Sequence, residues 1–393
     1  MVKRIICLLL SLAVVCSCGA AACAEEDGAA VSSNEAYEDE VGLCAPSALL
    51  MDSSTGKTLY EKNAHERRPC ASITKVMTLC LVFEAIDEGK LSYSDVVTTS
   101  PMAAAQGGSD IWLVEGEQMT VDDLLKAVVV VSANDAAVAL AEAVCGTEDA
   151  FVARMNEKAK ALGMNDTEFK NCNGLDEDGH LTSACDVALM SRELMKHERV
   201  FDYTSIWLDY IRDGATQLVN TNRLLKSYDG ITGLKTGTTS LAGACISATA
   251  QRGDLSLIAV VLGDKTTDER FSDAAKLLDY GFGAFCAAAP QLPEELPRSV
   301  AVEGGMKGEV GAVCVPEGKF LMKNGTQDQL RCEVQLPETV KAPVKEGQIL
   351  GSVVYKCGSE TLGTLPVTAA EGVEPVNFRD TFMLLLGALL HGV

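Results

Sequence analysis

The chain has 393 residues, of which 47% are hydrophobic and 22% charged, a composition typical of folded proteins that excludes an intrinsically disordered chain. This length exceeds what one hydrophobic core usually supports, so we expect two domains with terminal extensions. The formal net charge of -22 disfavours nucleic acid as a partner, because phosphate backbones are bound by clustered Lys and Arg.

Residues 1–24 have the pattern of a secretory signal peptide. A basic start is followed by an apolar run over 5–15, and Ala22-Cys23-Ala24 resembles a cleavage site. The polar and acidic residues 25–42 then show no apolar period, which is typical of a solvated leader. The sequence therefore predicts an exported protein whose mature chain begins near Glu25, rather than a hydrophobic helix buried in a core.

The chain contains 15 cysteines, and the 11 that follow the signal segment stand singly, without the spacing of a metal site. Most of them are interpreted as small core hydrophobes. No zinc site, other metal site or cofactor is predicted, and no disulfide pairing is assigned.

The first folded segment is predicted to be a hairpin followed by a buried helix. Apolar residues 45–51 and residues 58–61 flank a polar, glycine-containing turn, which is the pattern of two paired strands. From Ser72 to Glu88 apolar residues recur every three or four positions, and Gly89 follows as a C-cap. We expect a largely buried helix that begins at or beside Ser72.

Helical periods also fill the middle of the chain, over 121–145, 149–163 and 184–197. The polar residues from Ser132 to Asp135 interrupt the first of these helices. Polar side chains in so apolar a stretch call for a functional reason.

Strand patterns return near the end of this domain, over 234–238, 244–250 and 255–262, and a last helix is predicted over 271–282. The first hairpin and these strands flank the helical middle. We therefore predict an α/β (α+β) domain over 43–286, with one mostly antiparallel sheet made from both ends of the domain and a helical lobe inserted between them.

The composition changes after a predicted linker over 286–289. Prolines punctuate the chain and short alternating segments follow, which predict a small all-β domain over 297–370. The final stretch, 376–393, ends in an apolar run shorter than the roughly 20 residues that span a bilayer. An in-plane membrane anchor fits this stretch, and a helix packed on the β domain is the alternative.

The segment Ser72-Ile73-Thr74-Lys75 places a hydroxyl and an amine three residues apart on a predicted helix. Residues at this spacing share a helix face, so the Lys75 amine reaches the Ser72 hydroxyl. A serine becomes a nucleophile when a base takes its proton, and a lysine is such a base where burial and positive neighbours lower its pKa. Alone the motif is weak, because the same spacing occurs where a serine only caps a helix.

Two further motifs supply partners for this pair. Ser132-Ala133-Asn134 offers a hydroxyl and a carboxamide that would relay a proton and hold a substrate amide, although alone it is a polar helix break. Lys235-Thr236-Gly237-Thr238 lies on a predicted strand that would line a substrate backbone, with Gly237 allowing close approach. Thr236 would donate to a carboxylate and Lys235 would add positive charge. Together the three motifs predict an acyl-transfer enzyme.

With these motifs the chain resembles the low-molecular-mass penicillin-binding proteins, specifically the serine-type D-alanyl-D-alanine carboxypeptidases. The resemblance implies a β-lactamase/transpeptidase-like domain, a stem peptide ending in D-Ala-D-Ala as substrate, β-lactam antibiotics as ligands, and attachment to the outer face of the cytoplasmic membrane. It covers about residues 45–285 closely and is carried by Met51-Asp52, Tyr60-Glu61-Lys62-Asn63, Ala71 to Lys75, Ser132 to Ala136, Asp229-Gly230 to Thr239, and Arg270-Phe271 to Tyr280-Gly281-Phe282.

The resemblance also implies which residues move protons. Ser72 would form the acyl-enzyme and Lys75 would be the acylation base. Ser132 and Lys235 would pass protons onward.

The remaining roles implied by the resemblance concern substrate binding. Asn134 would hold the substrate amide, and the backbone NH groups of Ser72 and Thr238 would form the oxyanion hole. Thr236 and Arg270 would recognise the terminal D-alanine carboxylate, for which a guanidinium is well shaped.

Two positions depart from the family pattern. Cys70 stands where proline or another small residue is common, and Asn171-Cys172-Asn173-Gly174-Leu175 lacks the expected proline–histidine form. These departures bear on fine substrate preference and leave the predicted reaction unchanged.

Three other functions are alternatives to the D-alanyl-D-alanine carboxypeptidase reaction. A Ser-His-Asp triad is disfavoured, because the four histidines lack a nucleophile-elbow context and are interpreted as surface or loop residues. A serine β-lactamase shares the three motifs but needs a separate base for deacylation, and no Glu-x-x-x-Asn element lies between the second and third motifs. A catalytically silent wall-binding protein would have no need for Lys75.

Overall fold

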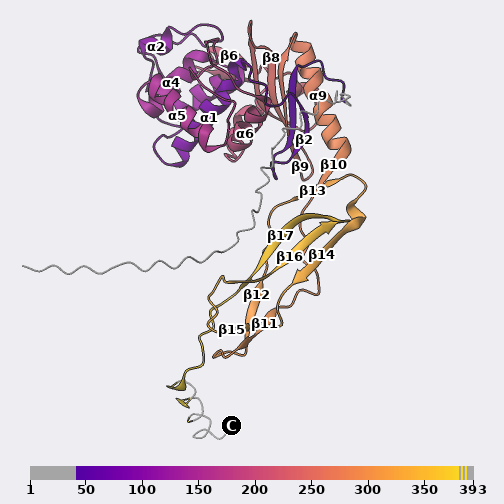
Figure 1. Cartoon of the computed structure of the whole chain (residues 1–393). Helices are drawn as coiled ribbons and strands as arrows, with labels where there is room; N and C mark the ends of the chain where they lie inside the picture. The colour runs from indigo at the N-terminus through magenta and orange to yellow at the C-terminus, as the bar shows by residue number, and fades with distance from the viewer. Residues whose placement is uncertain (1–40, 380–381, 384–385, 387–393) are drawn as a thin grey trace, which may run out of the picture. The chain divides into compact units, whose positions relative to one another are not determined.

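The computed structural model describes residues 41–379, 382–383 and 386 (Figure 1). The predicted signal peptide 1–24, nearly all of the predicted leader 25–42 and most of the predicted anchor 376–393 lie outside the described residues. The described chain contains a five-stranded sheet with helices, and a six-stranded sheet later in the sequence.

The first sheet is antiparallel and has the strand order β2-β1-β9-β8-β7. β1 (Ser47–Asp52) and β2 (Thr58–Lys62) form the predicted hairpin. β7 (Ile231–Thr239), β8 (Gly243–Arg252) and β9 (Leu255–Asp264) complete the sheet, and β1 pairs directly with β9. The predicted sheet made from both ends of the domain is confirmed.

Side chains on both faces of this sheet are buried. Leu49 and Met51 pack in a core that they share with the helical lobe, whereas Ala48 and Leu50 pack in a second core with α9 (Thr267–Ala284). Successive strand residues point to opposite faces, so the sheet is a middle layer between helices, as Figure 1 shows. The predicted helix over 271–282 is therefore confirmed as α9, which covers one face.

The helices of the lobe and its small hairpins lie between β2 and β7 in sequence. They confirm the helical middle, because most of their apolar residues belong to one core. The elements are α1 (Lys75–Asp87), β3 (Val96–Thr98), α2 (Pro101–Ala104), β4 (Gln118–Thr120), α3 (Val121–Lys126), α4 (Asn134–Cys145), α5 (Glu148–Ala161), α6 (Ala184–Leu194), α7 (Val200–Thr204), β5 (Leu208–Ile211), β6 (Thr216–Val219) and α8 (Leu224–Ser227).

The start of the nucleophile helix differs in detail from the expectation. Ser72 lies in a short 3-10 turn, η1 (Ala71–Thr74), and the α-helix begins three residues after Ser72, at Lys75. Ala71 enters this turn with φ of +51°, a left-handed conformation from which an α-helix cannot continue backwards. The tight turn thereby separates Ser72 from the regular helix.

The predicted interruption of the second helix is confirmed. α3 runs into a π-helical turn, η2 (Ala127–Val131), and Ser132 follows with φ of +65° before α4 begins at Asn134. Wide helical turns of this kind are common at functional sites.

The later part of the chain is all-β, as predicted. Its six-stranded sheet has the order β14-β16-β17-β12-β11-β15. The strands are β11 (Ser299–Glu303), β12 (Glu309–Val313), β14 (Leu330–Gln335), β15 (Thr339–Lys341), β16 (Ile349–Cys357) and β17 (Glu360–Ala369), and a 3-10 turn, η3 (Gln327–Gln329), precedes β14.

The predicted linker over 286–289 is wrong. This stretch forms β10 (Phe285–Ala288), which pairs antiparallel with β13 (Phe320–Lys323). Cys286 lies opposite Met322 and the strand is half-buried. The alanines of this stretch show no alternation of apolar and polar residues, so the sequence pattern does not predict a strand. The strand is recognised only from its pairing with β13.

All 11 cysteines in the described part of the chain are free. Five of them are buried, in agreement with their interpretation as core residues: Cys70, Cys80, Cys172, Cys245 and Cys314.

Candidate active site

Ser72 and Lys75 meet as their spacing predicted. Lys75 Nζ lies 2.9 Å from Ser72 Oγ, and the Lys75 side chain is fully buried. The amine has two further contacts, with Asn134 Oδ1 at 2.5 Å and with the backbone oxygen of Asn173 at 2.6 Å. Both of these oxygens act only as acceptors.

The amine can donate to all three oxygens, which satisfies the three N–H groups of an ammonium, and the same contacts also suit the uncharged amine that a base requires. A neutral amine has two N–H donors for the oxygens of Asn134 and Asn173, and its lone pair is left to accept the proton of the Ser72 hydroxyl. Burial lowers the pKa of Lys75 from 10.5 to about 7, although the carboxylates of Asp110 and Asp135 oppose the shift. Lys75 is therefore suited to be the base that activates Ser72.

Asn134 connects this pair to the wall of the cleft. Its Nδ2 donates to the backbone oxygen of Gly107 at 2.6 Å, and its backbone NH donates to the oxygen of Ser109 at 2.6 Å. The Oδ1 atom accepts from Lys75 and has a second lone pair. Asn134 can thus position Lys75 and still accept a substrate amide NH.

Ser132 presents an unused hydroxyl. The residue is 5% exposed, and no group among the described residues hydrogen-bonds its Oγ. A buried hydroxyl without a partner is costly unless a ligand or water completes it. Because this hydroxyl has no protein partner among the described residues, it is available to bind a substrate or to transfer a proton.

Lys235 is buried on β7, with Nζ donating to the oxygen of Thr236 at 3.0 Å. No hydrogen bond joins Lys235 to Ser132 in the described structure. Burial, with the positive charges of Lys75 and Arg270, lowers the pKa of Lys235 well below its usual value. It is therefore unfavourable for Lys75 and Lys235 to be positively charged at the same time.

β7 runs directly against the nucleophile turn at Gly237. A Cβ on this residue would lie 2.7 Å from the oxygen of Cys70 and 2.9 Å from the backbone nitrogen of Ser72. Only glycine permits this approach. It places the NH of Ser72 beside the strand that continues to Thr238, as an oxyanion hole made of both NH groups requires.

Arg270 reaches the same strand from α9. Its Nη1 donates to Gly237 O and to Thr238 Oγ1, each at 3.0 Å, and to Cys245 O at 3.3 Å. The Arg270 side chain is 4% exposed, and burial lowers its pKa to about 10, so it remains charged at neutral pH. The guanidinium thus lies beside Thr238, the exposed last residue of Lys235-Thr236-Gly237-Thr238.

Thr236 has a partner that the sequence did not reveal. Its Oγ1 lies 2.6 Å from Oγ1 of Thr221, which precedes α8. Thr221 is exposed, whereas Thr236 is buried. Together they present two adjacent hydroxyls at the residue before Gly237, whose backbone oxygen Arg270 contacts.

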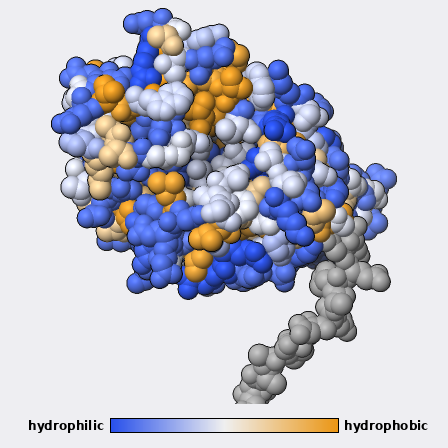
Figure 2. All heavy atoms as spheres, turned by 90° about the horizontal axis from the view of Figure 1, so that it is seen from above, coloured by the Kyte–Doolittle hydropathy of each residue, from blue (hydrophilic) through white to orange (hydrophobic). Residues whose placement is uncertain are grey.

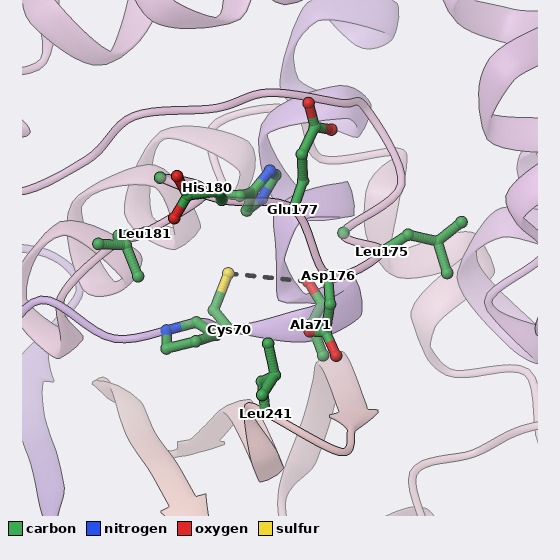
Figure 3. Close-up of a pocket in the computed structure, with 12 residues that line it drawn as sticks. Cys70, Ala71, Leu175, Asp176, Glu177, His180, Leu181 and Leu241 are labelled. Atoms are coloured by element: carbon green, nitrogen blue, oxygen red, sulfur yellow. Dashed lines mark hydrogen bonds between the residues drawn. The ribbon is translucent and has the colours of Figure 1, made fainter.

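A cavity of about 320 Å³ adjoins the nucleophile turn on another side (Figure 3). Pro69, Cys70 and Ala71 line it from the turn, and the 174–181 segment lines it opposite. Cys70 Sγ lies 3.7 Å from the oxygen of Ala71, the contact drawn in Figure 3. The unusual Cys70 therefore points toward this cavity.

His180 lies in the loop between α5 and α6, which agrees with the interpretation of the histidines as surface or loop residues, but its side chain is buried. It is 4% exposed, and its Nδ1 accepts from the backbone NH of Lys170 at 3.1 Å. Nε2 therefore carries the proton and donates to Thr74 Oγ1 at 2.7 Å. Burial lowers the pKa of His180 from 6.5 to about 4, which agrees with this neutral form. His180 thus braces the turn that holds Ser72.

The structure brings all nine predicted site residues to one region around β7, η1 and the start of α4. Sequence reasoning missed Asn173, Thr221 and His180. Asn173 acts through its backbone oxygen, which has no residue-type signal, and the other two are recognisable only from tertiary contacts.

Comparisons with known proteins identify the family of the chain. The family model described as D-alanyl-D-alanine carboxypeptidase matches residues 33–266, and the model of the penicillin-binding protein 5 C-terminal domain matches residues 294–375. The chain is 39% identical to D-alanyl-D-alanine carboxypeptidase DacF of Bacillus subtilis over 96% of both chains.

Solved structures show the same likeness. Penicillin-binding protein 5 from Haemophilus influenzae is 29% identical with a TM-score of 0.74, covering 84% of this chain and 98% of that one. Penicillin-binding protein D2 from Listeria monocytogenes, in an ampicillin-bound form, is 36% identical with a TM-score of 0.56, covering 61% of this chain and 98% of that one.

Replacing Gly237 with alanine should abolish most acylation of Ser72. The added Cβ would push β7 away from the nucleophile turn, and losing one oxyanion donor costs roughly 10²- to 10³-fold in rate. The rate of labelling by fluorescent penicillin measures the effect. Gly283→Ala is the matched control, since its Cβ would meet nothing within 4 Å. Wild-type labelling of Gly237→Ala would contradict the proposed fit.

The acylation rate should rise with pH through about 7, the pKa to which burial lowers Lys75. Only the uncharged amine accepts the Ser72 proton, so the rate falls about tenfold per pH unit below the pKa and is level above it. Second-order labelling rates between about pH 5 and 9 test this. Lys75→Arg, which stays charged, should label slowly at every pH. A flat wild-type profile would exclude Lys75 as the base.

Proposed function

We propose, since the chain belongs to the D-alanyl-D-alanine carboxypeptidase family, that it performs this serine carboxypeptidase reaction through an acyl-enzyme on Ser72. One observation carries the assignment of the nucleophile. The buried Lys75 amine lies 2.9 Å from Ser72 Oγ, and its other two contacts are with oxygens that only accept. Lys75 can therefore direct its lone pair to the Ser72 proton.

The reaction proceeds in two halves. Lys75 takes the proton of Ser72 while Oγ attacks the carbonyl carbon of the penultimate D-alanine. The carbonyl oxygen becomes negative and is stabilised by the NH groups of Ser72 and Thr238. The C–N bond breaks, and the proton that Lys75 took passes by way of Ser132 and Lys235 to the leaving amine of the terminal D-alanine. Water then attacks the ester carbonyl, the C–O bond to Ser72 breaks, a proton from the water returns to Oγ, and the shortened peptide leaves as a carboxylic acid.

The terminal carboxylate is held at the exposed end of β7. Arg270 supplies a charged guanidinium beside Thr238, and the hydroxyls of Thr236 and Thr221 lie 2.6 Å from each other. Asn134, with one lone pair of Oδ1 unused, accepts the substrate amide NH. With these contacts the peptide lies along β7, the edge strand of the sheet, as an added strand.

The substrate is the peptidoglycan stem peptide that ends in D-Ala-D-Ala, and β-lactams acylate the same serine. A serine β-lactamase would need a second base for rapid deacylation. The polar partners of Lys75 are instead Ser72, Asn134 and a backbone oxygen, none of which is a carboxylate. A silent binding protein has no use for a buried amine at a serine hydroxyl, because burying it costs free energy without return.

The location follows from the two ends of the sequence. The signal pattern over 1–24 supports export, and residues 376–393 support attachment to the outer face of the cytoplasmic membrane. Within the described part of the chain, no helix is both long and apolar enough to cross a bilayer. An anchor lying in the plane of the membrane fits the exposed apolar side chains at this end, namely Phe378, Phe382, Met383 and Leu386.

We also propose a division into a catalytic domain over 43–286 and a β domain over 297–370. The two family models match separate parts of the chain, 33–266 and 294–375. The two central sheets lie within these proposed bounds.

Ser72→Ala should release no D-alanine from an acetylated peptide ending in D-Ala-D-Ala, while its circular dichroism spectrum stays unchanged. The same variant should gain no mass after brief exposure to penicillin, whereas the wild type gains one adduct on Ser72. Ser94→Ala, at an exposed serine, is the matched control and should behave as wild type. Equal release by Ser72→Ala would reject the mechanism, and a wild-type adduct that disappears within seconds would favour the β-lactamase.

Deleting residues 378–393 should move the enzyme from the membrane to the soluble fraction without reducing kcat on a soluble peptide. The removed segment holds the exposed Phe378 and Phe382, which are 86% and 53% exposed. Fractionation followed by an activity assay of both fractions gives the answer. An unchanged distribution would favour the alternative of a helix packed on the β domain.

A further inference from the structure

Trp112 is displayed on the surface in an unusual way. Its side chain is 79% exposed, while its neighbours Ile111 and Leu113 are 1% and 3% exposed. Its φ of +57° lies in the left-handed region, which is a genuine outlier for so bulky a residue. Such a conformation persists only where the surrounding structure imposes it, and it is concentrated at functional sites.

The surrounding contacts hold this backbone from both sides. The buried carboxylate of Asp135 accepts from the NH of Ile111 at 3.1 Å and from the NH of Leu113 at 2.9 Å. Arg212 donates to the oxygen of Ile111 at 2.9 Å and pairs with Glu117 at 2.7 Å. The peptide units on each side of Trp112 are therefore anchored, so the indole is presented with little loss of entropy on binding.

The same segment forms a wall of the active site. Gly107 accepts from the side chain of Asn134, and Ser109 accepts from its backbone NH. Asp135 directly follows Asn134 in the sequence, and its carboxylate holds the peptide units on both sides of Trp112. Trp112 is five residues beyond Gly107 and hence within about 17 Å of it along the backbone.

This upper limit on the separation of Gly107 and Trp112 is comparable with the length of an extended peptide stem. The stem connects the scissile D-Ala-D-Ala bond to an N-acetylated sugar of the glycan strand. The roughly four residues between them span about 14 Å when extended. A stem bound with its D-Ala-D-Ala end at Ser72 is therefore long enough to bring its sugar to the part of the wall that carries Trp112.

We propose that Trp112 is a stacking platform for the N-acetylated sugar that carries the stem peptide, an inference that rests on the proposed carboxypeptidase function. The C–H face of a pyranose packs on the large apolar face of an indole, and the sugar hydroxyls remain in water. Figure 2 shows a mostly hydrophilic surface with separate apolar patches on the face seen from above in Figure 1. Glu115 and Ser109, both exposed, provide polar groups in the same segment. An amphipathic sugar suits an exposed aromatic side chain with polar groups in the same segment.

The kinetic test compares two substrates that differ only in the sugar. Trp112→Ala should lower kcat/KM roughly three- to tenfold, mainly through KM, on a disaccharide-pentapeptide. It should leave kcat/KM unchanged on the same pentapeptide without sugar, and leave penicillin labelling unchanged. Trp112→Phe should retain most of the effect, and Val114→Ala, at a side chain that is 63% exposed two residues away, is the matched control.

A binding test separates this proposal from the reaction itself. The chain has only two tryptophans, so a Ser72→Ala, Trp207→Phe protein emits from Trp112 alone. Titration with the disaccharide-pentapeptide should change this fluorescence at concentrations where the sugar-free pentapeptide does not. Ser72→Ala cannot be acylated, so this result does not depend on the proposed mechanism.

Every other outcome overturns the proposal. An equal loss of kcat/KM on both substrates would mean that Trp112 supports the peptide-binding wall. No loss on either substrate, or no fluorescence response to the disaccharide-pentapeptide, would mean that the indole binds no sugar.

Discussion

The burial of the Lys75 amine is the constraint on which the rest of the site depends. A lone charge in a protein interior costs several kcal/mol, so the amine must either lose its proton or find oxygens. Here it does both, since burial lowers its pKa to about 7 and three oxygens contact it. The oxygens come from three segments: the nucleophile turn, the start of α4 and the loop that contains Asn173. The site is assembled only when all three are packed in place.

The five-stranded sheet sets where these segments meet. It is covered on one face by α9 and on the other by the lobe that carries α1 and α4. α9 brings Arg270 through to the end of β7, while the lobe brings Ser72, Lys75 and Asn134 to its side. Gly237 allows β7 to touch the nucleophile turn, because any side chain there would collide with backbone atoms of the turn. The site thus lies where the last strand of the sheet meets the turn that carries Ser72.

Three of the six non-glycine residues with positive φ in the described part of the chain lie in the nucleophile turn, the segment that contacts Asn134, and the break before α4. Ala71, Trp112 and Ser132 all have positive φ, and the π-helical turn η2 ends at Ser132. Each lies in or beside a segment that presents a group to the substrate in our proposal. The buried carboxylate of Asp135 and the buried His180 are two of the groups that hold such segments, through hydrogen bonds to backbone or to Thr74. Regular elements could not point these groups into one space.

The sequence by itself determined the elements and the chemistry. Apolar periods predicted the hairpin, the helices and β7 to β9 within a few residues, and the spacing of Ser72 and Lys75 placed an amine at a hydroxyl, because short-range geometry within one helix turn or strand is local. Only the tertiary structure decided that 285–288 is a strand, that His180 is buried, that Asn173 contacts Lys75 and that Thr221 contacts Thr236. These facts depend on contacts between segments far apart in the chain, and a backbone oxygen, a paired edge strand or a left-handed residue has no signature in residue type.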